Sequence, residues 1–414
     1  MNFLDIYFAF LSLVLPITSF LLIPSIQGTT PAYILALLAI PLVTLIKSIG
    51  RKKYIKDISI IISLFVLLNT ISQFGLIFSI PNFGNLTLID ADDDTLILRG
   101  SMFTQSIYFL ASVSTFCFVK SFYRNRYNKF IFLGSLLLAL YGIYEFLYFL
   151  MFNNNGDFIS NRSFQSGNFL VSGSSFQILA LGFLRIMRLK SLTGEPSMYA
   201  FTILPFWIFA IHENKSFTQI ILLITLVLST STTAIIGIMT YVITQIFYLK
   251  TYYFNRKKIL SFCFVFSIIF ILITTNIDFC INAFNQLFVN KVTANDTSGI
   301  VRRGSFEANI SFFCSASIIN QLFGIGFGYI RSMDMFSTLL INNGIIGLLI
   351  FTLLFLYPLI KLKNTDKNIG LKSIIIVIYV TMMISVPEYS YLVIWLFLGI
   401  AYNQLSYQKK LQAN

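Results

Sequence analysis

The residues of this chain that could handle a phosphorylated substrate gather in two long hydrophilic segments, 153–197 and 276–334. In the first segment, Arg185 and Arg188 precede Glu195. Guanidinium groups stay charged and bind phosphate oxygens in pairs, so both arginines suit an anionic group. A carboxylate such as Glu195 can accept the proton of a hydroxyl group. This segment therefore has residue types that could hold an anion and move a proton.

The second segment repeats that layout. Arg302 and Arg303 precede an apolar stretch, 310–323, and Asp334 stands where the next apolar run begins. Between them lies a glycine run formed by Gly324, Gly326 and Gly328. No strand is expected before it, so a nucleotide-binding fingerprint is not indicated. A flexible turn that brings backbone N–H groups near an anion or a sugar is the interpretation we retain.

The charged residues of the first segment also have a purely structural interpretation. The apolar segment 176–189 predicts an interfacial helix, on which Arg185 and Arg188 would share one face. There they could extend to lipid headgroups or turn inward to a phosphate, and the spacing alone favours neither. Glu195 stands at the expected start of a helix, where a carboxylate interacts well with the helix dipole and Pro196 suits the first turn.

The elements that must position these residues are apolar helices. The composition is 57% hydrophobic and 11% charged, whereas soluble domains carry roughly 25% charged residues. Apolar stretches long enough to cross a ~30 Å hydrocarbon layer recur along the chain. We therefore expect an all-α polytopic transmembrane bundle, a single integral membrane domain over 1–414, with two external loops carrying interfacial helices. The expected spans, about twelve, are 3–24, 31–49, 57–79, 101–119, 130–152, 198–213, 217–230, 232–249, 259–276, 335–360, 371–387 and 389–405.

The basic residues predict the orientation of the bundle. Of the 29 lysines and arginines, 20 fall on one side of the expected spans, in loops such as Lys47–Lys56 and Lys120–Lys129. Basic residues accumulate in cytoplasmic loops, so both termini are predicted in the cytoplasm and both long segments outside. The net charge of +13 is explained by this distribution, and a nucleic-acid partner is not indicated.

Four short motifs resemble those of bacterial O-antigen and capsular polysaccharide polymerases of the Wzy type. The first is Arg-x6-Glu-Pro-Ser, from Arg188 to Ser197, which leads into an expected span. The second is Ser298-Gly299 with Arg302-x-Gly304-Ser305. The third is the glycine run followed by Asn343-Gly344. A small polar run, 228–234, also looks like an element of this family. The resemblance covers roughly residues 185–355 and leaves the N-terminal half unmatched except in hydrophobicity.

This resemblance implies a glycosyltransferase at the periplasmic face of the bacterial inner membrane, in lipopolysaccharide or capsule biosynthesis. Such an enzyme moves a glycan chain from undecaprenyl diphosphate onto an incoming lipid-linked repeat unit. The leaving diphosphate would be bound by Arg188 and Arg302, with Arg185 and Arg303 as further candidates. Glu195 or Asp334 would accept the proton. The implied partners are the undecaprenyl-diphosphate-linked oligosaccharide, the lipid bilayer and a chain-length regulator protein.

Two other functions remain open. A flippase or other transporter would fit the expected number of spans, and Glu145 is then a candidate because it lies inside one. An O-antigen ligase would share the topology, but that family carries a functional histidine in its large external loop. The only histidine here, His212, falls at a predicted cytoplasmic boundary.

The sequence indicates no cofactor and no metal site. The acidic run from Asp90 to Asp94 resembles the start of a calcium loop but lacks the glycine and glutamate of an EF-hand. No nucleotide-binding loop or zinc-ligand spacing is present. Cys280 and Cys314 share an expected external loop, where a disulfide would be chemically allowed.

Overall fold

A computed structural model describes residues 3–249, apart from 25, 79–80, 82, 85, 91, 163, 167–168, 172–175 and 182–183, and residues 297–413. The described chain is mostly helical. Its α-helices are α1 (Phe3–Val14), α2 (Pro31–Leu45), α3 (Ile49–Phe78), α4 (Gly100–Phe122), α5 (Asn128–Phe152), α6 (Pro196–His212), α7 (Ser216–Leu228), α8 (Thr232–Leu249), α12 (Thr297–Ser315), α13 (Ile318–Phe323), α14 (Met335–Lys361), α15 (Asp366–Ile384) and α16 (Leu392–Ala413). Two short 3-10 helices, η1 (Asn125–Tyr127) and η2 (Ser191–Thr193), complete the helical part.

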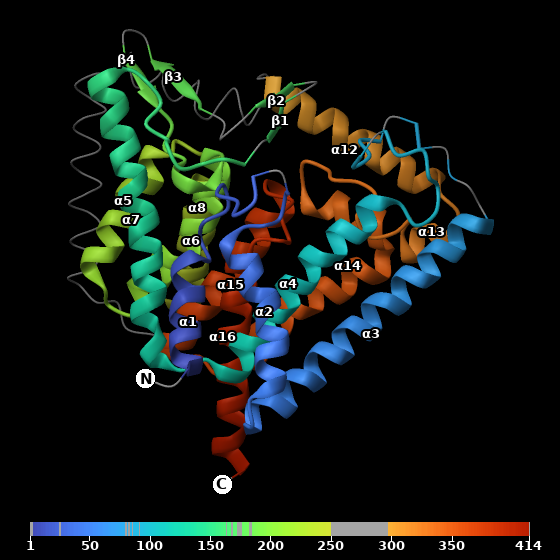
Figure 1. The fold of residues 1–414 in the computed structure, drawn as a ribbon, viewed down its shortest axis with the longest axis horizontal. Helices are drawn as coiled ribbons and strands as arrows, with labels where there is room; N and C mark the ends of the chain where they lie inside the picture. The colour runs from blue at the N-terminus through green and yellow to red at the C-terminus, as the bar shows by residue number, and fades with distance from the viewer. Residues whose placement is uncertain are drawn as a thin grey trace.

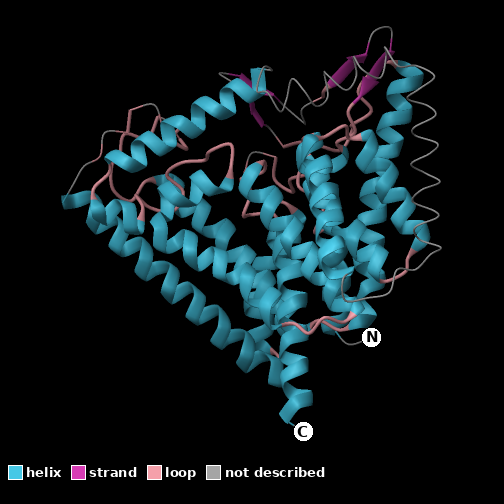
Figure 2. Cartoon of the chain, turned by 180° about the vertical axis from the view of Figure 1, so that it is seen from behind, coloured by secondary structure: helices cyan, strands magenta, loops and turns pink. Residues whose placement is uncertain are grey.

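The helices form a bundle with two distinct ends. Both chain termini lie at one end, the lower one in Figure 1. The opposite, upper end carries two small hairpins and α12, which crosses above the ends of other helices (Figures 1 and 2). Helices α15 and α16 occupy the middle, where α16 packs on α4 and α15 packs on α6 and α8. Parts of both long hydrophilic segments therefore lie at the same end of the molecule.

Five described helices are long and apolar enough to cross a membrane: Gly50–Phe78, Gly100–Phe122, Asn125–Phe152, Met335–Lys361 and Asp366–Ile384. The chain is thus a mostly helical membrane protein. Each expected span within the described residues contains a helix, but several of these helices are short, and twelve spans are not confirmed. The expected span 259–276 lies outside the described residues.

The first expected span, 3–24, is only partly helical, because α1 ends at Val14. Pro16 follows, and its missing N–H and fixed ring disfavour continuation of the helix. Beyond it, the backbone N–H groups of Thr18 and Ser19 both donate to the carbonyl of Leu192. The chain after α1 is therefore paired with the end of the first long segment.

The expected interfacial helix over 176–189 is wrong. The structure has a hairpin there, in which β3 (Ile178–Leu181) pairs antiparallel with β4 (Leu184–Met187). A smaller hairpin, β1 (Phe164–Ser166) with β2 (Phe169–Val171), precedes it. Short apolar runs do not distinguish helix from strand by periodicity, and Gly182 in the middle of this run lowers its helix propensity. The second long segment does contain helices, α12 and α13.

Local capping explains where two helices next to the long segments begin. Pro196 occupies the first turn of α6, where its missing N–H costs nothing. The carboxylate of Asp334 accepts the backbone N–H of Ser337 at 2.6 Å and caps α14. Both starts follow from the sequence of the first turn alone.

Candidate functional site

We call residues 188–195 the arm, because this stretch leads from the second hairpin to the start of α6. Arg188 opens it, and its backbone N–H still pairs with the carbonyl of Gln177 at 2.9 Å. Its guanidinium donates to the Thr230 hydroxyl at 3.2 Å, to the Thr230 carbonyl at 3.3 Å and to the Gln177 side chain at 2.5 Å. Arg188 thus holds the turn between α7 and α8.

Arg185 and Arg188 were expected to share one face of a helix. They lie three residues apart on an extended chain, so they do not share a face, and the side chain of Arg185 is exposed.

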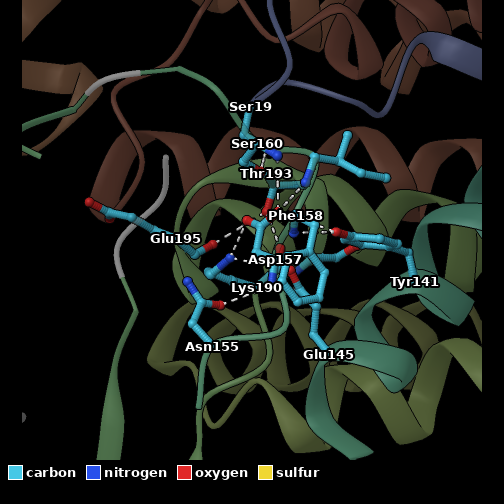
Figure 3. Close-up of polar contacts among 12 residues, drawn as sticks. Ser19, Tyr141, Glu145, Asn155, Asp157, Phe158, Ser160, Lys190, Thr193 and Glu195 are labelled. Atoms are coloured by element: carbon cyan, nitrogen blue, oxygen red, sulfur yellow. Dashed lines mark hydrogen bonds and ion pairs between the residues drawn. The ribbon is translucent and has the colours of Figure 1, made fainter. Parts of the chain in front are cut away.

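Lys190 of the arm forms ion pairs with Glu145 and Asp157. We call these three buried charges the buried triad (Figure 3). The ammonium of Lys190 lies 2.6 Å from Asp157 and 3.3 Å from Glu145. All three side chains are at most 2% exposed. Burial pushes the pKa of Asp157 upward, but Lys190 and hydrogen bonds from Ser160 outweigh it and hold that pKa below its ordinary value.

Glu195 ends the arm and keeps its carboxylate partly accessible. It stands at the N-cap of α6 without capping it, and its carboxylate accepts the Ser197 hydroxyl at 3.4 Å. Electrostatic attraction reaches it from Arg188 and from Arg331. Burial lowers the pKa of Arg188, and the charge of Glu195 opposes that shift. Glu195 is therefore a carboxylate near two cations that lacks a capping bond.

The arginines of α12 are more exposed than the arm. One guanidinium nitrogen of Arg302 lies 3.4 Å from the carbonyl of Ser385, at the end of α15. The Ser385 hydroxyl contacts Thr233 at 3.1 Å, in the polar run that Arg188 also holds. Arg303 pairs with Glu307 one turn along the exposed face of α12. Arg188 therefore contacts the small polar run 228–234 directly, whereas Arg302 contacts Ser385, which in turn contacts the run at Thr233.

Asp334 and the glycine run have structural roles in the fold. Asp334 is committed to the cap of α14 and also accepts the Ser332 hydroxyl at 3.3 Å. Gly324 has a φ of +77°, and a Cβ there would stand 2.3 Å from the carbonyl oxygen of Asn342. Gly344, which interrupts α14 with a φ of +66°, would collide in the same way with the backbone of Leu322. The backbone near Gly324 and the backbone of α14 near Gly344 thus pass in direct contact, which only glycine permits.

The backbone of the glycine run is already hydrogen-bonded to its surroundings. The N–H groups of Ile325 and Gly326 donate to carbonyls of α14 at 2.9 and 3.0 Å. The N–H of Phe327 donates to the Asn69 side chain at 2.9 Å. The predicted turn with free N–H groups is therefore a packed crossing at these positions, whereas Gly328 lines a pocket.

That pocket is polar and draws on both long segments. Arg162 comes from the first segment and Arg331 from the second, and Glu388 faces them from the connection between α15 and α16. Arg331 forms an ion pair with Glu388. Further lining is provided by aromatic and amide side chains, namely Tyr33, Gln105, Tyr108, Asn342 and Tyr389. The cavity between these side chains measures about 40 Å³.

Arg331 lies in a depression of the surface. Its side chain keeps 48% of its surface exposed, yet the surrounding protein partly desolvates the guanidinium and lowers its pKa. An arginine remains charged under such a shift. The Glu388 carboxylate also accepts the Ser390 hydroxyl at 2.8 Å. The pocket therefore joins a permanent cation with a carboxylate and with planar and aromatic side chains.

Reasoning from the sequence missed Arg162, Arg331 and Glu388 as site residues. A signal existed for the two arginines, because both belong to the minority of basic residues on the less basic side of the spans. Glu388 had no such signal, since it falls between two expected spans without a motif. The pairing of Arg331 with Glu388 depends on tertiary contacts.

Three further features considered from the sequence are a disulfide, the acidic run and metal binding. Cys314 is exposed and free among the described residues, and Cys280 lies outside them, so the expected disulfide is untested. Asp93 of the acidic run accepts hydrogen bonds from Thr95 and Gly100, which lower its pKa to about 2. Among the described residues, no group of three histidine, cysteine or acidic side chains is arranged to hold a metal ion.

Comparison with protein-family models, with curated proteins and with solved structures found no match to this chain. The class of the protein therefore rests on its own fold, that of a mostly helical membrane protein. Its candidate site combines the polar pocket with the arm and the exposed start of α12. Such a site could bind an anionic, partly sugar-like group through arginines, amides and aromatic rings.

Proposed function

We propose that the protein is a polysaccharide polymerase of the bacterial inner membrane, a glycosyltransferase that acts on lipid-linked repeat units. In this proposal it moves a growing glycan from undecaprenyl diphosphate onto the incoming unit at the periplasmic face. The supporting observation is that each long segment contributes one arginine, Arg162 or Arg331, to a single polar pocket. The order of the motifs between residues 185 and 355 points in the same direction.

The chemistry requires few groups. The acceptor hydroxyl attacks the anomeric carbon of the donor sugar, the bond from that carbon to the diphosphate breaks, and the diphosphate leaves with the electron pair. Fixed cations stabilise the charge that develops on the leaving group. Arg162 and Arg331 are suited to that role in the pocket, with Arg188 and Arg302 as further candidates. No cofactor is needed for this transfer.

A carboxylate must take the proton of the acceptor hydroxyl. Glu195 suits this role better than Asp334, because Asp334 is committed to the cap of α14. Glu195 has no capping bond and is attracted to both Arg188 and Arg331. In the proposed mechanism, Glu195 is therefore the general base that accepts the proton of the acceptor hydroxyl.

The proposed function also requires a binding site for the lipid tail of the substrate. An apolar cavity of about 370 Å³ lies between α3 and α4. Its lining includes Met102 and Ser106 of α4, and the neighbouring α4 residues Gln105 and Tyr108 line the polar pocket. A substrate with a hydrocarbon tail and a charged head could thus use both sides of α4.

One observation favours a flippase as the second candidate. Helix α14 is interrupted at Gly344, and broken helices near the middle of the membrane are typical of transporters. The two functions differ in what they require, since transport needs two compartments and polymerisation does not.

The deciding experiment uses purified full-length protein in detergent with synthetic lipid-linked repeat units. A polymerase forms glycan ladders without any membrane barrier, whereas a flippase leaves single repeats. We expect Arg331→Gln to abolish the ladders. Lys367→Gln is the matched control, because Lys367 pairs with Glu213 at the opposite end of the bundle. Single repeats from the unmodified protein, together with transport in vesicles, would replace polymerase by flippase.

A further inference from the structure

The buried triad contains two carboxylates and one ammonium group. Lys190 is the partner of both Glu145 and Asp157, and all three side chains are almost completely excluded from the surface. With every group ionised, one negative charge would remain unbalanced in the interior. An unbalanced buried charge is costly, and proteins usually remove it by taking up or releasing a proton.

We propose that the buried triad is a proton-binding site in which Glu145 carries one proton while Asp157 and Lys190 stay ionised. The site then has no net charge. This inference rests on the charges and distances of the triad and is independent of the proposed polymerase activity.

The geometry distinguishes the two carboxylates. Asp157 is the nearer partner of Lys190, at 2.6 Å, and it accepts the backbone N–H groups of Ser160 and Ile159 at 3.0 and 3.2 Å. These donors stabilise the ionised form. Glu145 is 3.3 Å from Lys190 and accepts the N–H of Ser191 at 2.9 Å. The carboxylate with fewer donors and the longer ion pair is the one expected to keep the proton.

The phenols of two tyrosines also lie close to the triad. Tyr141 of α5 donates to Asp157 at 3.3 Å, and Tyr199 of α6 interacts electrostatically with Glu145 (Figure 3 shows Tyr141). Neutral phenols do not balance the excess charge. Their presence leaves the argument for a bound proton unchanged.

Among the residues that the structure describes, the remaining elements packed against α5 do not add a cation to the triad. Helix α7 and η2 contain no acidic or basic residue. Helix α1 and η1 approach the other end of α5, where Asp5 pairs with Arg126. The side chain of Arg185, on β4, is exposed.

The proton would matter for the position of the arm. Ser191, the residue after Lys190, donates its N–H to Glu145 and its hydroxyl to the carbonyl of Leu138 at 2.7 Å. Loss of the proton would place two anions around one ammonium beneath the arm. We therefore expect the neutral triad to hold the arm between its two ends, Arg188 and Glu195.

The direct test is infrared spectroscopy of the purified full-length protein at neutral pH, which detects the carbonyl band of a protonated carboxyl group. We expect the band in the unmodified protein. It should disappear in Glu145→Gln and also in Asp157→Asn, because one carboxylate then matches one ammonium. Glu307→Gln, which changes an exposed carboxylate on α12, is the control and should leave the band unchanged. A band that persists in Glu145→Gln, or its absence from the unmodified protein, would overturn the proposal.

Thermal unfolding distinguishes which carboxylate holds the proton. Glutamine resembles a protonated glutamate, so Glu145→Gln should leave the melting temperature nearly unchanged. Asp157→Asn should lower it, and Lys190→Met should lower it most, by about 10 °C, since it leaves the buried Asp157 anion without its cation. If Asp157→Asn is the neutral change and Glu145→Gln the damaging one, the proton is not on Glu145.

The pH dependence has a defined sign. A group that holds a proton only in the folded state makes stability fall as pH rises above its ordinary pKa, about 4.3 for glutamate. Glu145→Gln removes this group, so its melting temperature should fall less with rising pH than that of the unmodified protein. Equal slopes for the two proteins would contradict a proton on Glu145.

Discussion

The arm and α12 carry the same kinds of residue, yet the rest of the molecule treats them differently. The arm is held by the buried triad beneath it and by the contacts of Arg188 with Thr230 and Gln177. Helix α12 presents Arg302 and Arg303 on an exposed surface. The difference teaches that a cation with several protein partners positions the chain, whereas an exposed one remains available for a ligand.

The carboxylates at the ends of the two long segments show the same contrast in reverse. Glu195 follows the tightly held arm but keeps its own carboxylate without a capping bond. Asp334 follows the more exposed second segment but is fully used as a cap. Rigid surroundings and a spare functional group are what a catalytic carboxylate needs.

The largest expected effect concerns these carboxylates. Glu195→Gln should slow polymerisation of purified lipid-linked repeats by about 10²–10⁴-fold, because a positioned general base contributes that much. Asp334→Asn should keep most activity, since asparagine caps a helix nearly as well as aspartate. Ladder formation by both variants at equal membrane levels measures this. Normal ladders from Glu195→Gln with none from Asp334→Asn would move the base to the second segment.

The next effect concerns the support of the arm. Lys190→Met should destabilise the protein by about 3–5 kcal/mol, because it leaves the buried Asp157 carboxylate without its cation. Arg303→Met, which removes a cation that is 75% exposed, should have no measurable effect on stability. Denaturation of both variants in detergent gives the comparison. Equal stability would mean that the triad does not anchor the arm.

A smaller effect separates Arg188 from Arg302. Arg188→Ala removes three hydrogen bonds in a partly buried place and should cost about 1–3 kcal/mol of stability as well as activity. Arg302→Ala should remove activity while stability stays near that of the unmodified protein, because the hydrogen bond that Arg302 donates to the Ser385 carbonyl is long, at 3.4 Å. Stability and ladder assays on the same samples test this. Stable but inactive Arg188→Ala would place this arginine beside the substrate.

The smallest effect is a gain. Gly304 lies in α12, and no atom stands within 4 Å of the position that a Cβ would take. Gly304→Ala should therefore stabilise α12 by about 0.5–1 kcal/mol through helix propensity. Gly324→Ala is the contrasting variant and should destabilise, given its positive φ and the nearby backbone. A destabilised Gly304→Ala would indicate that the exposed face of α12 contacts something when the protein is in its membrane.

Sequence reasoning located most of the helices well because each depends on a local property, the length of an apolar run. The observed bounds of α5 and α8 lie within a few residues of the expected spans. The start of α14 was also readable, since Asp334 can cap only the helix that follows it. The hairpin over 178–187 was not, because a short apolar run fits a helix and a strand equally well.

What the sequence by itself determined is thus the set of apolar segments, the two long hydrophilic segments and the residue types that they carry. The tertiary structure decided the environment of each charge. Lys190 meets Glu145 and Asp157 across 45 and 33 residues, and Arg331 meets Glu388 across the whole length of α14 and α15. The energy of a charge depends on burial and on partners distant along the chain. Residue spacing reveals neither burial nor distant partners, so only the fold separates an anchoring cation from one that can bind a substrate.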